Sequence, residues 1–189
     1  MDEKAVRILD AARQRFERFG VKKTTMDEIC QDVGISKKTL YEYFNSKEDL
    51  FVSTFIQEAL ANRDLVLEQM QGMDNPLEKI QELFRFAVNR QWNQSFMIRV
   101  LQDEDGLYHF FLKDKYRLQV EDGVLSLIED VLKAGVEQGQ FRAMNTRTAA
   151  YFLFKLFQSI TFAKTESIEG GQEDLEEMIA FITAGILKV

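Results

Sequence analysis

The sequence predicts an all-α fold, in which a small three-helix head precedes a larger helical body. Apolar residues recur at the helical period along most of the chain, and no segment has the alternating pattern of a strand. One proline and ten glycines in 189 residues leave few interruptions to long helices. We expect the head to occupy residues 1–46 and the body to occupy residues 47–189.

The first predicted helix carries a single apolar stripe and ends at a glycine. Ile8, Ala12, Phe16 and Phe19 share one face of this helix, so all four are expected to point into the head. Gly20 follows them and is placed to cap the C-terminus in a left-handed conformation.

Residues 25–44 have the order of elements typical of a helix-turn-helix. Thr25 and Glu28 have the spacing of a capping box before a two-turn helix. Gly34 then interrupts the pattern, and Ser36 can cap a second short helix.

Hydrogen-bond donors crowd the second helix, whose inward-facing residues are few. The apolar positions are Leu40 and Phe44, and the polar ones include Lys37, Lys38, Thr39, Tyr41 and Tyr43. A recognition helix needs such donors, because its first side chains meet base edges while others bind phosphates. From composition alone, a small solvated helix in an ordinary bundle remains the alternative.

The remaining helices are predicted from capping residues and apolar stripes. We expect one helix to run from about Lys47 towards Met70, a second to begin at Asn75-Pro76, and a third to end at Gly139. A fourth should run from Asn145 or Thr146 to Gly170-Gly171, and the last should run through Ile186. The stretch 94–106 is ambiguous between a short helix and a turn.

The charge distribution separates the head from the body. The first 50 residues hold ten basic and ten acidic side chains, so the net charge of −7 arises entirely from the remainder. Within the head, the stretch 13–23 carries five positive charges against Glu17. A local basic face matters more for phosphate contact than the charge of the whole chain.

The composition argues against several other classes of protein. A single cysteine, Cys30, excludes an internal disulfide and a multi-cysteine metal site, and no cofactor is expected. No secretory signal follows Met1, and the longest apolar run, 149–154, is too short to cross a membrane. We therefore expect a cytoplasmic protein without a membrane partner.

The helix-turn-helix and its flanks read Thr24-Thr25-Met26-Asp27-Glu28-Ile29, followed after four residues by Gly34-Ile35-Ser36-Lys37-Lys38-Thr39-Leu40-Tyr41-Glu42-Tyr43-Phe44-Asn45-Ser46-Lys47-Glu48-Asp49-Leu50. This segment closely resembles the TetR/AcrR family of bacterial transcriptional regulators. The match covers about the first 55 residues. It implies a DNA-binding head on a body that dimerises and binds a ligand. Carried over residue by residue, it implies phosphate contacts at Thr25, Tyr41, Tyr43 and Lys47, groove contacts at Lys37, Lys38 and Thr39, and a place for Ser36 in the same DNA-binding set.

Aromatic residues are dense in the body and supply candidates for a ligand pocket. Each ring by itself favours a core position, and the resemblance favours an apolar cavity between helices. The candidates are Phe84, Trp92, Phe96, Tyr108, His109, Phe111, Tyr151 and Phe154. His109 is the only histidine and cannot form a metal site alone, and an aromatic lining suits a small hydrophobic or aromatic ligand.

The last two predicted helices supply candidates for a dimer interface. The helix that contains Tyr151 is apolar nearly all round, which is typical of a central or a shared helix. The resemblance implies that the last two helices of each protomer form the interface. The candidates are Phe152, Ile160, Leu175, Ile179, Ile182 and Ile186.

The leading hypothesis is a homodimeric repressor that a small ligand releases from a palindromic DNA operator. One alternative is a constitutive DNA-binding regulator whose body only dimerises and lacks a cavity. An enzyme is the other alternative, but the sequence offers no nucleophile–base pair, metal cluster or phosphate loop.

Overall fold

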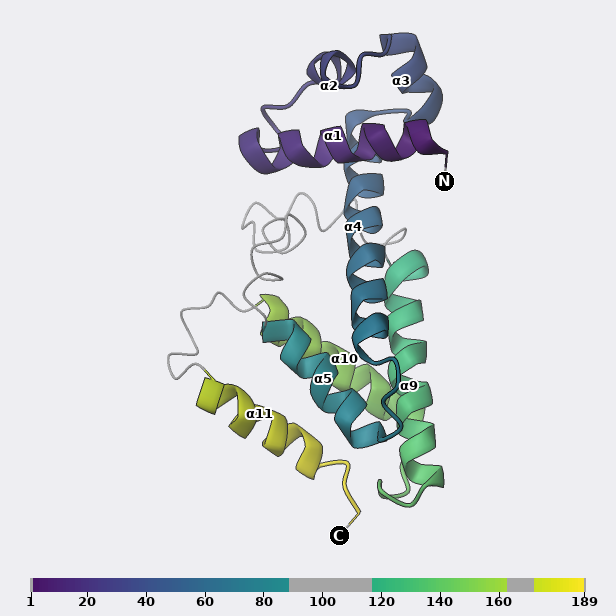
Figure 1. Cartoon of the computed structure of the whole chain (residues 1–189), viewed down its shortest axis with the longest axis vertical. Helices are drawn as coiled ribbons and strands as arrows, with labels where there is room; N and C mark the ends of the chain where they lie inside the picture. The colour runs from purple at the N-terminus through teal and green to yellow at the C-terminus, as the bar shows by residue number, and fades with distance from the viewer. Residues whose placement is uncertain (1, 89–116, 163–171, 189) are drawn as a thin grey trace.

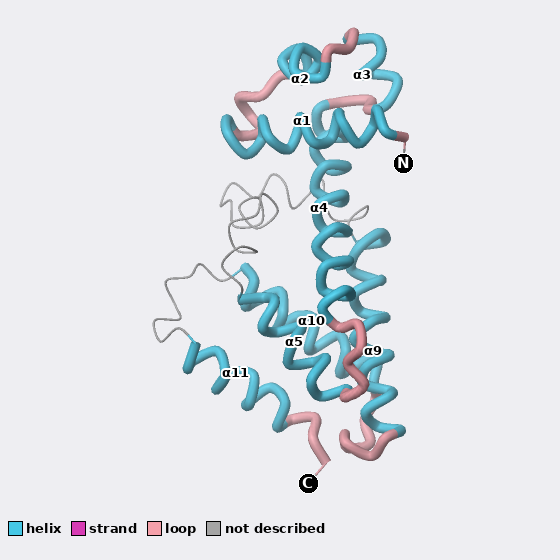
Figure 2. The backbone as a smooth tube through the Cα atoms, in the orientation of Figure 1, coloured by secondary structure: helices cyan, strands magenta, loops and turns pink. Residues whose placement is uncertain are grey.

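The molecule is elongated, with the head at one end and a bundle of helices at the other (Figure 1). The computed structural model describes residues 2–88, 117–162 and 172–188. Secondary structure within these ranges is helical, and the single β-bridge joins Phe141 to Leu187 (Figure 2). The all-α prediction is therefore confirmed.

Three helices form the head, and polar caps fix where each begins. They are α1 (Glu3–Phe19), α2 (Met26–Val33) and α3 (Lys37–Tyr43). The capping side chains are Asp2, Thr25 and Ser36, each of which accepts a hydrogen bond from a backbone N–H of the first turn. Both halves of the predicted capping box at Thr25 and Glu28 are present.

Helix α4 (Lys47–Gln69) belongs to the head and to the body at once. Its 23 residues span about 35 Å. The first turns pack on α1, where the ring of Phe51 lies edge-on to that of Phe16 with 5.8 Å between centroids. Its later turns run down into the body (Figure 1). The helix begins at Lys47 as predicted and ends one residue before Met70.

The body packs around α9 and α5. Its elements are α5 (Pro76–Val88), the π-helical turn η1 (Arg117–Glu121), α9 (Asp122–Glu137), α10 (Thr146–Phe162) and α11 (Gln172–Ala184). Helix α10 contacts both α9 and α5, and α11 packs on α5. The predicted starts at Pro76 and Thr146 are confirmed, and Asn145 accepts a hydrogen bond from the backbone of Thr148.

Phe19 differs from its predicted inward position. Its side chain is 46% exposed, and the guanidinium groups of Arg15 and Arg18 lie over its ring. Phe19 is the last residue of α1, so the apolar stripe continues past the point where a neighbouring helix can cover it. Cation–π contacts replace core packing there.

The C-terminal tail is clasped to the loop between α9 and α10. Arg142 donates its backbone N–H to Ile186, and Lys188 donates to Gln140, both at 3.0 Å. On the other side of this loop, the Phe141 ring lies directly on Gly135 of α9, where an added Cβ would come within 2.0 Å of the ring. Gly135 therefore allows the loop to sit close enough to α9 for the tail to pair with it.

We expect Gly135→Ala to destabilise the body, because the new methyl group would overlap the buried Phe141 ring. Overpacking of this kind costs about 1–3 kcal/mol of the free energy of unfolding. Urea unfolding of the purified protein measures the effect. Gly123→Ala, at a helical glycine where a Cβ would meet its nearest neighbour at 3.9 Å, is the matched control. Equal stability of the two variants would contradict the close packing at Gly135.

Candidate nucleic-acid interface

The turn between α2 and α3 fixes the angle at which α3 leaves the head. Gly34 ends α2 in the left-handed conformation, with φ 73° and ψ 39°, and its N–H bonds to the Cys30 carbonyl. Leu40 is fully buried and Phe44 is 7% exposed, so these two residues anchor α3 to the head core. The opposite face of α3 is consequently left to solvent.

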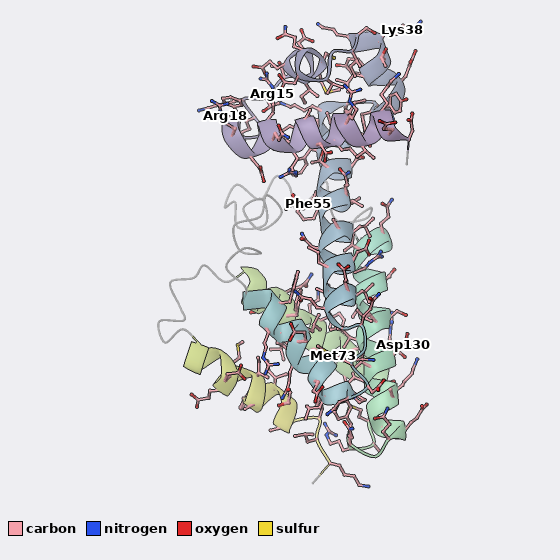
Figure 3. The ribbon with its side chains drawn as sticks, in the orientation of Figure 1. Arg15, Arg18, Lys38, Phe55, Met73 and Asp130 are labelled. Atoms are coloured by element: carbon pink, nitrogen blue, oxygen red, sulfur yellow. The ribbon has the colours of Figure 1, made fainter. Side chains whose placement is uncertain are left out.

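The exposed face of α3 carries the predicted DNA-contacting side chains. Ser36, Lys37, Lys38 and Tyr41 are exposed, and Thr39 is half-buried. Figure 3 shows Lys38 at the end of the head farthest from the body. Within the described part of the chain, Lys38 forms no ion pair. The structure therefore brings these residues to one surface.

The neighbouring Lys37 is paired with an aspartate of α2. Its Nζ lies 2.6 Å from Oδ2 of Asp27, and both side chains are more than half exposed. This hydrogen bond from Lys37 to the Asp27 carboxylate raises the pKa of Lys37 above its ordinary value. Lys37 therefore remains charged at neutral pH, but a carboxylate balances that charge.

Tyr43 is likewise held by an aspartate. Its hydroxyl donates to Asp2 at 2.5 Å, and the same carboxylate caps α1 through the N–H of Lys4. The bond lowers the pKa of Asp2 and raises the pKa of Tyr43. Asp2 thus ties the start of α1 to the end of α3.

The basic stretch 13–23 is less basic on the surface than the sequence suggests. Arg15 bridges two carboxylates of α2, lying 3.1 Å from Glu28 and 2.9 Å from Asp32. Arg13 pairs with Glu17 within α1 at 3.2 Å. Arg15 therefore holds α1 to α2, whereas Arg13 is balanced within its own helix, because the folded head places acidic side chains beside both.

Lys47, which is predicted to contact a phosphate, is engaged by backbone carbonyls of the head. Its ammonium group donates to the backbone carbonyls of Val21 at 3.0 Å, Thr24 at 3.1 Å and Lys22 at 3.5 Å. A lysine has three donors and no acceptor, so these contacts use all of them. The ammonium at the start of α4 thereby caps the turn that leads into Thr25.

Two of the predicted pocket residues are buried in the body, and one is on its surface. Phe84 is fully buried and Phe154 is 3% exposed, whereas Tyr151 is half exposed. The other candidates, Trp92, Phe96, Tyr108, His109 and Phe111, lie outside the described residues. Two surface hollows of the described ranges, one along α4 and one between α9 and the start of α5, are lined by none of Phe84, Tyr151 and Phe154.

The predicted dimer residues divide between surface and core. Phe152 is 63% exposed, but Ile179, Ile182 and Ile186 are buried in the chain's own core and leave little surface for a partner. The side chains of Ile160 and Leu175 lie outside the described part of the structure. The reason for the difference is that the apolar stripe of α11 packs inward on α5.

Sequence reasoning missed two exposed apolar side chains on the same helices. Leu156 on α10 is 44% exposed, and Phe181 on α11 is 83% exposed. Phe181 stands off the stripe formed by Ile179, Ile182 and Ile186. A large aromatic residue on the polar side of an amphipathic helix was the signal that could have identified it.

The described residues contain neither a membrane-spanning helix nor a metal-binding cluster. No helix in those ranges is long and apolar enough to cross a bilayer. In the same ranges, no three histidine, cysteine, aspartate or glutamate side chains are grouped so that they could hold a metal ion.

The sequence of the head matches the model of a known family. Residues 8–54, from α1 into the first turns of α4, match "Bacterial regulatory proteins, tetR family". The chain belongs to the TetR family of transcriptional regulators. Residues 8–54 of this TetR-family protein contain the whole helix-turn-helix, so DNA binding is assigned to α2, the turn and α3. Members of the family are regulators and not enzymes, which decides against the enzymatic alternative.

Relatives of this TetR-family protein match along most of its length. The uncharacterized regulator YhgD of Bacillus subtilis is 25% identical over 158 residues, which cover 82% of this chain and 81% of YhgD. The transcriptional repressor KstR2 of Mycobacterium tuberculosis is 28% identical over 144 residues, covering 71% of this chain and 68% of KstR2. The structure of the fatty acid degradation regulator FadR of Bacillus halodurans is similar in fold, with a TM-score of 0.68, 24% identity and coverage of 97% and 94%.

We expect Lys47→Met to destabilise the head of the TetR-family protein, because methionine keeps the stem and loses the three hydrogen bonds to carbonyls. A hydrogen bond that involves a charged group contributes about 1.5–3 kcal/mol after its exchange with water is counted, so the loss of this shared donor should cost about 2 kcal/mol or more. Hydrogen exchange of the backbone amides at 21–25 measures the effect locally. Lys38→Met is the control and should leave this exchange unchanged. Unchanged protection in Lys47→Met would contradict the capping role.

Proposed function

We propose that this TetR-family regulator is a homodimeric repressor that binds a palindromic operator and is released by a small hydrophobic molecule. The observation that carries the proposal is the pairing of two exposed surfaces on one molecule. The donor-rich face of α3 lies at the tip of the head, and large apolar side chains lie unburied on the last two helices.

The proposed DNA contacts follow from exposure and from the donors that remain available. Lys38 and Tyr41 are exposed on α3, and Thr25 is exposed at the N-terminus of α2, where the helix dipole favours a phosphate. Lys37 and Thr39 lie one turn or less from the start of α3, where a recognition helix reads base edges. Ser36 and Tyr43 complete the set, whereas Lys47 contributes by holding the turn before Thr25.

The proposed dimer uses the exposed apolar side chains of α10 and α11. Phe152, Leu156 and Phe181 are 63%, 44% and 83% exposed. Burying such residues between two copies removes apolar surface from water, the main favourable term in association. A two-fold dimer then presents two α3 helices to two half-sites about 34–36 Å apart.

The proposed division of labour places head functions in residues 1–46 and dimer and ligand functions in residues 47–189. Helix α4 connects the two units rigidly, because its first turns are buried against α1 and its later turns pack in the body. A movement of its body end would therefore reach the head through Phe51 and Lys47. A ligand can release DNA only if it binds the incompetent arrangement more tightly than the competent one.

A hydrophobic ligand and a repressing role are supported by sequence and by relatives. The aromatic density of the body suits an apolar ligand. FadR of Bacillus halodurans is named as a regulator of fatty acid degradation, and KstR2 is named as a repressor. We therefore propose repression, with a long-chain fatty acid as the first ligand to test.

We expect selection from random DNA to return inverted repeats, because a two-fold dimer presents two α3 helices.

We expect the double variant Phe152→Glu with Phe181→Glu to be monomeric. Two buried carboxylates at the interface would oppose association, so sedimentation should report half the mass and the variant should bind the selected operator more weakly. Leu65→Glu, on α4, is the control, since this leucine is 50% exposed and lies outside the proposed interface. Recovery of single unpaired half-sites, or an unchanged mass in the double variant, would contradict the dimer.

We expect a long-chain fatty acid to release the protein from the selected operator, and substitution of Trp92, Phe96 or Tyr108 by alanine to weaken that release. DNA affinity without the fatty acid should stay unchanged, because these residues lie outside the head. A titration of DNA binding with and without the fatty acid measures both quantities. Full release in all three variants would contradict this assignment of the pocket. If the fatty acid does not release the wild-type protein from the operator, this result would favour the alternative of a constitutive DNA-binding regulator.

A further inference from the structure

The first two residues of α3 are both lysines, but their electrostatic surroundings differ. Lys37 is within 2.6 Å of the Asp27 carboxylate. Lys38 is exposed, and no carboxylate of the described residues pairs with it. Two adjacent cations on one recognition helix are therefore unequal: the charge of one is balanced within the protein, and the charge of the other is open to DNA.

The position of Asp27 places its carboxylate beside the start of α3. Asp27 lies in the first turn of α2, and the side chain of Lys37, the first residue of α3, reaches its carboxylate. Its side chain is 53% exposed and that of Lys37 is 63% exposed, so the pair lies open at the surface. DNA can reach both groups without any rearrangement of the core.

We propose that Asp27 sets the operator specificity of this protein by holding the Lys37 ammonium until a matching base edge displaces it. The proposal rests on the DNA contact proposed above for Lys37. On non-specific DNA the ion pair persists, and Lys37 adds no net charge to the interface. On the operator, the two acceptors on the major-groove edge of a guanine take the place of the carboxylate.

The weakness of an exposed ion pair suits this role. Such pairs contribute little to stability, so a well-placed guanine can break this one. A phosphate on non-specific DNA offers a single charge at an uncontrolled distance. Breaking the ion pair leaves Asp27 unpaired in the negative field of the duplex in either complex, and the two acceptors at fixed positions on the guanine edge offset that cost. Specificity is a difference between two affinities, and Asp27 increases the difference by weakening the unwanted complex.

Salt dependence provides a direct measure of the charge that Lys37 contributes. Each phosphate charge that a protein neutralises adds about 0.9 to the slope of log affinity against log salt on duplex DNA. Binding to a short duplex of scrambled sequence should therefore become steeper by about 0.9 in Asp27→Asn, because Lys37 is then released to the backbone. At 0.15 M salt this corresponds to about fivefold tighter non-specific binding. The ratio of operator to scrambled affinity should fall by a similar factor.

The decisive comparison is Lys37→Met in two backgrounds. In the wild type it should leave the slope on scrambled DNA nearly unchanged. In Asp27→Asn it should lower the slope by about 0.9, because the lysine then contributes a full charge. Lys38→Met should lower the slope in both backgrounds. Asp10→Asn is the matched charge control: Asp10 is exposed on α1 and has no ion pair among the described residues, so its removal should not steepen the slope.

Each outcome separates this inference from the proposed function. Equal loss of slope by Lys37→Met in both backgrounds would show that Asp27 does not restrain Lys37, and it would leave the DNA contact of Lys37 intact. No loss in either background would remove Lys37 from the interface and overturn both statements. A lower stability of Asp27→Asn with an unchanged slope would reduce Asp27 to a residue that stabilises the start of α2. Palindromic selection by the wild type, measured separately, tests the regulator itself.

Discussion

The burial of α4 against α1 is the constraint on which the rest of the structure depends. Phe51 and Phe55 are almost completely buried in the N-terminal half of α4, and the ring of Phe51 contacts that of Phe16 in α1. Removing large apolar side chains from water is the main favourable term in folding. The same contact that completes the head core therefore fixes the direction in which the body leaves it.

Lys47 adds a polar contact to this apolar one. Its ammonium donates hydrogen bonds to backbone carbonyls of the loop between α1 and α2, which leads into the cap of α2. Backbone carbonyls at a tight turn need donors, and one lysine supplies several. The start of α4, the loop and the N-terminus of α2 consequently behave as one unit, which makes α4 a physical link between body and DNA-binding face.

The electrostatics of the head follow from where carboxylates fold against basic side chains. Arg15 and Arg13 are used within the head, Tyr43 is tied to Asp2, and Lys37 is tied to Asp27. A nearly neutral head can therefore still present a small, directed set of donors. For a protein with a net charge of −7, affinity for DNA has to come from the geometry of these few groups and not from bulk charge.

The sequence by itself determined the local structure, because caps and apolar periodicity act over a few residues. The N-caps Thr25 and Ser36 and the helix starts at Lys47, Pro76 and Thr146 could all be predicted, as could the helix-turn-helix and its family. Only the tertiary structure decided which long side chains meet. Lys47 reaches carbonyls 23 to 26 residues away, and Tyr43 reaches Asp2 across 41 residues. The stripe of α11 faced its own body because α5 lies against it, leaving Phe181 outside. Partners so distant along the chain leave no periodic signal, since the folded core alone sets their distance.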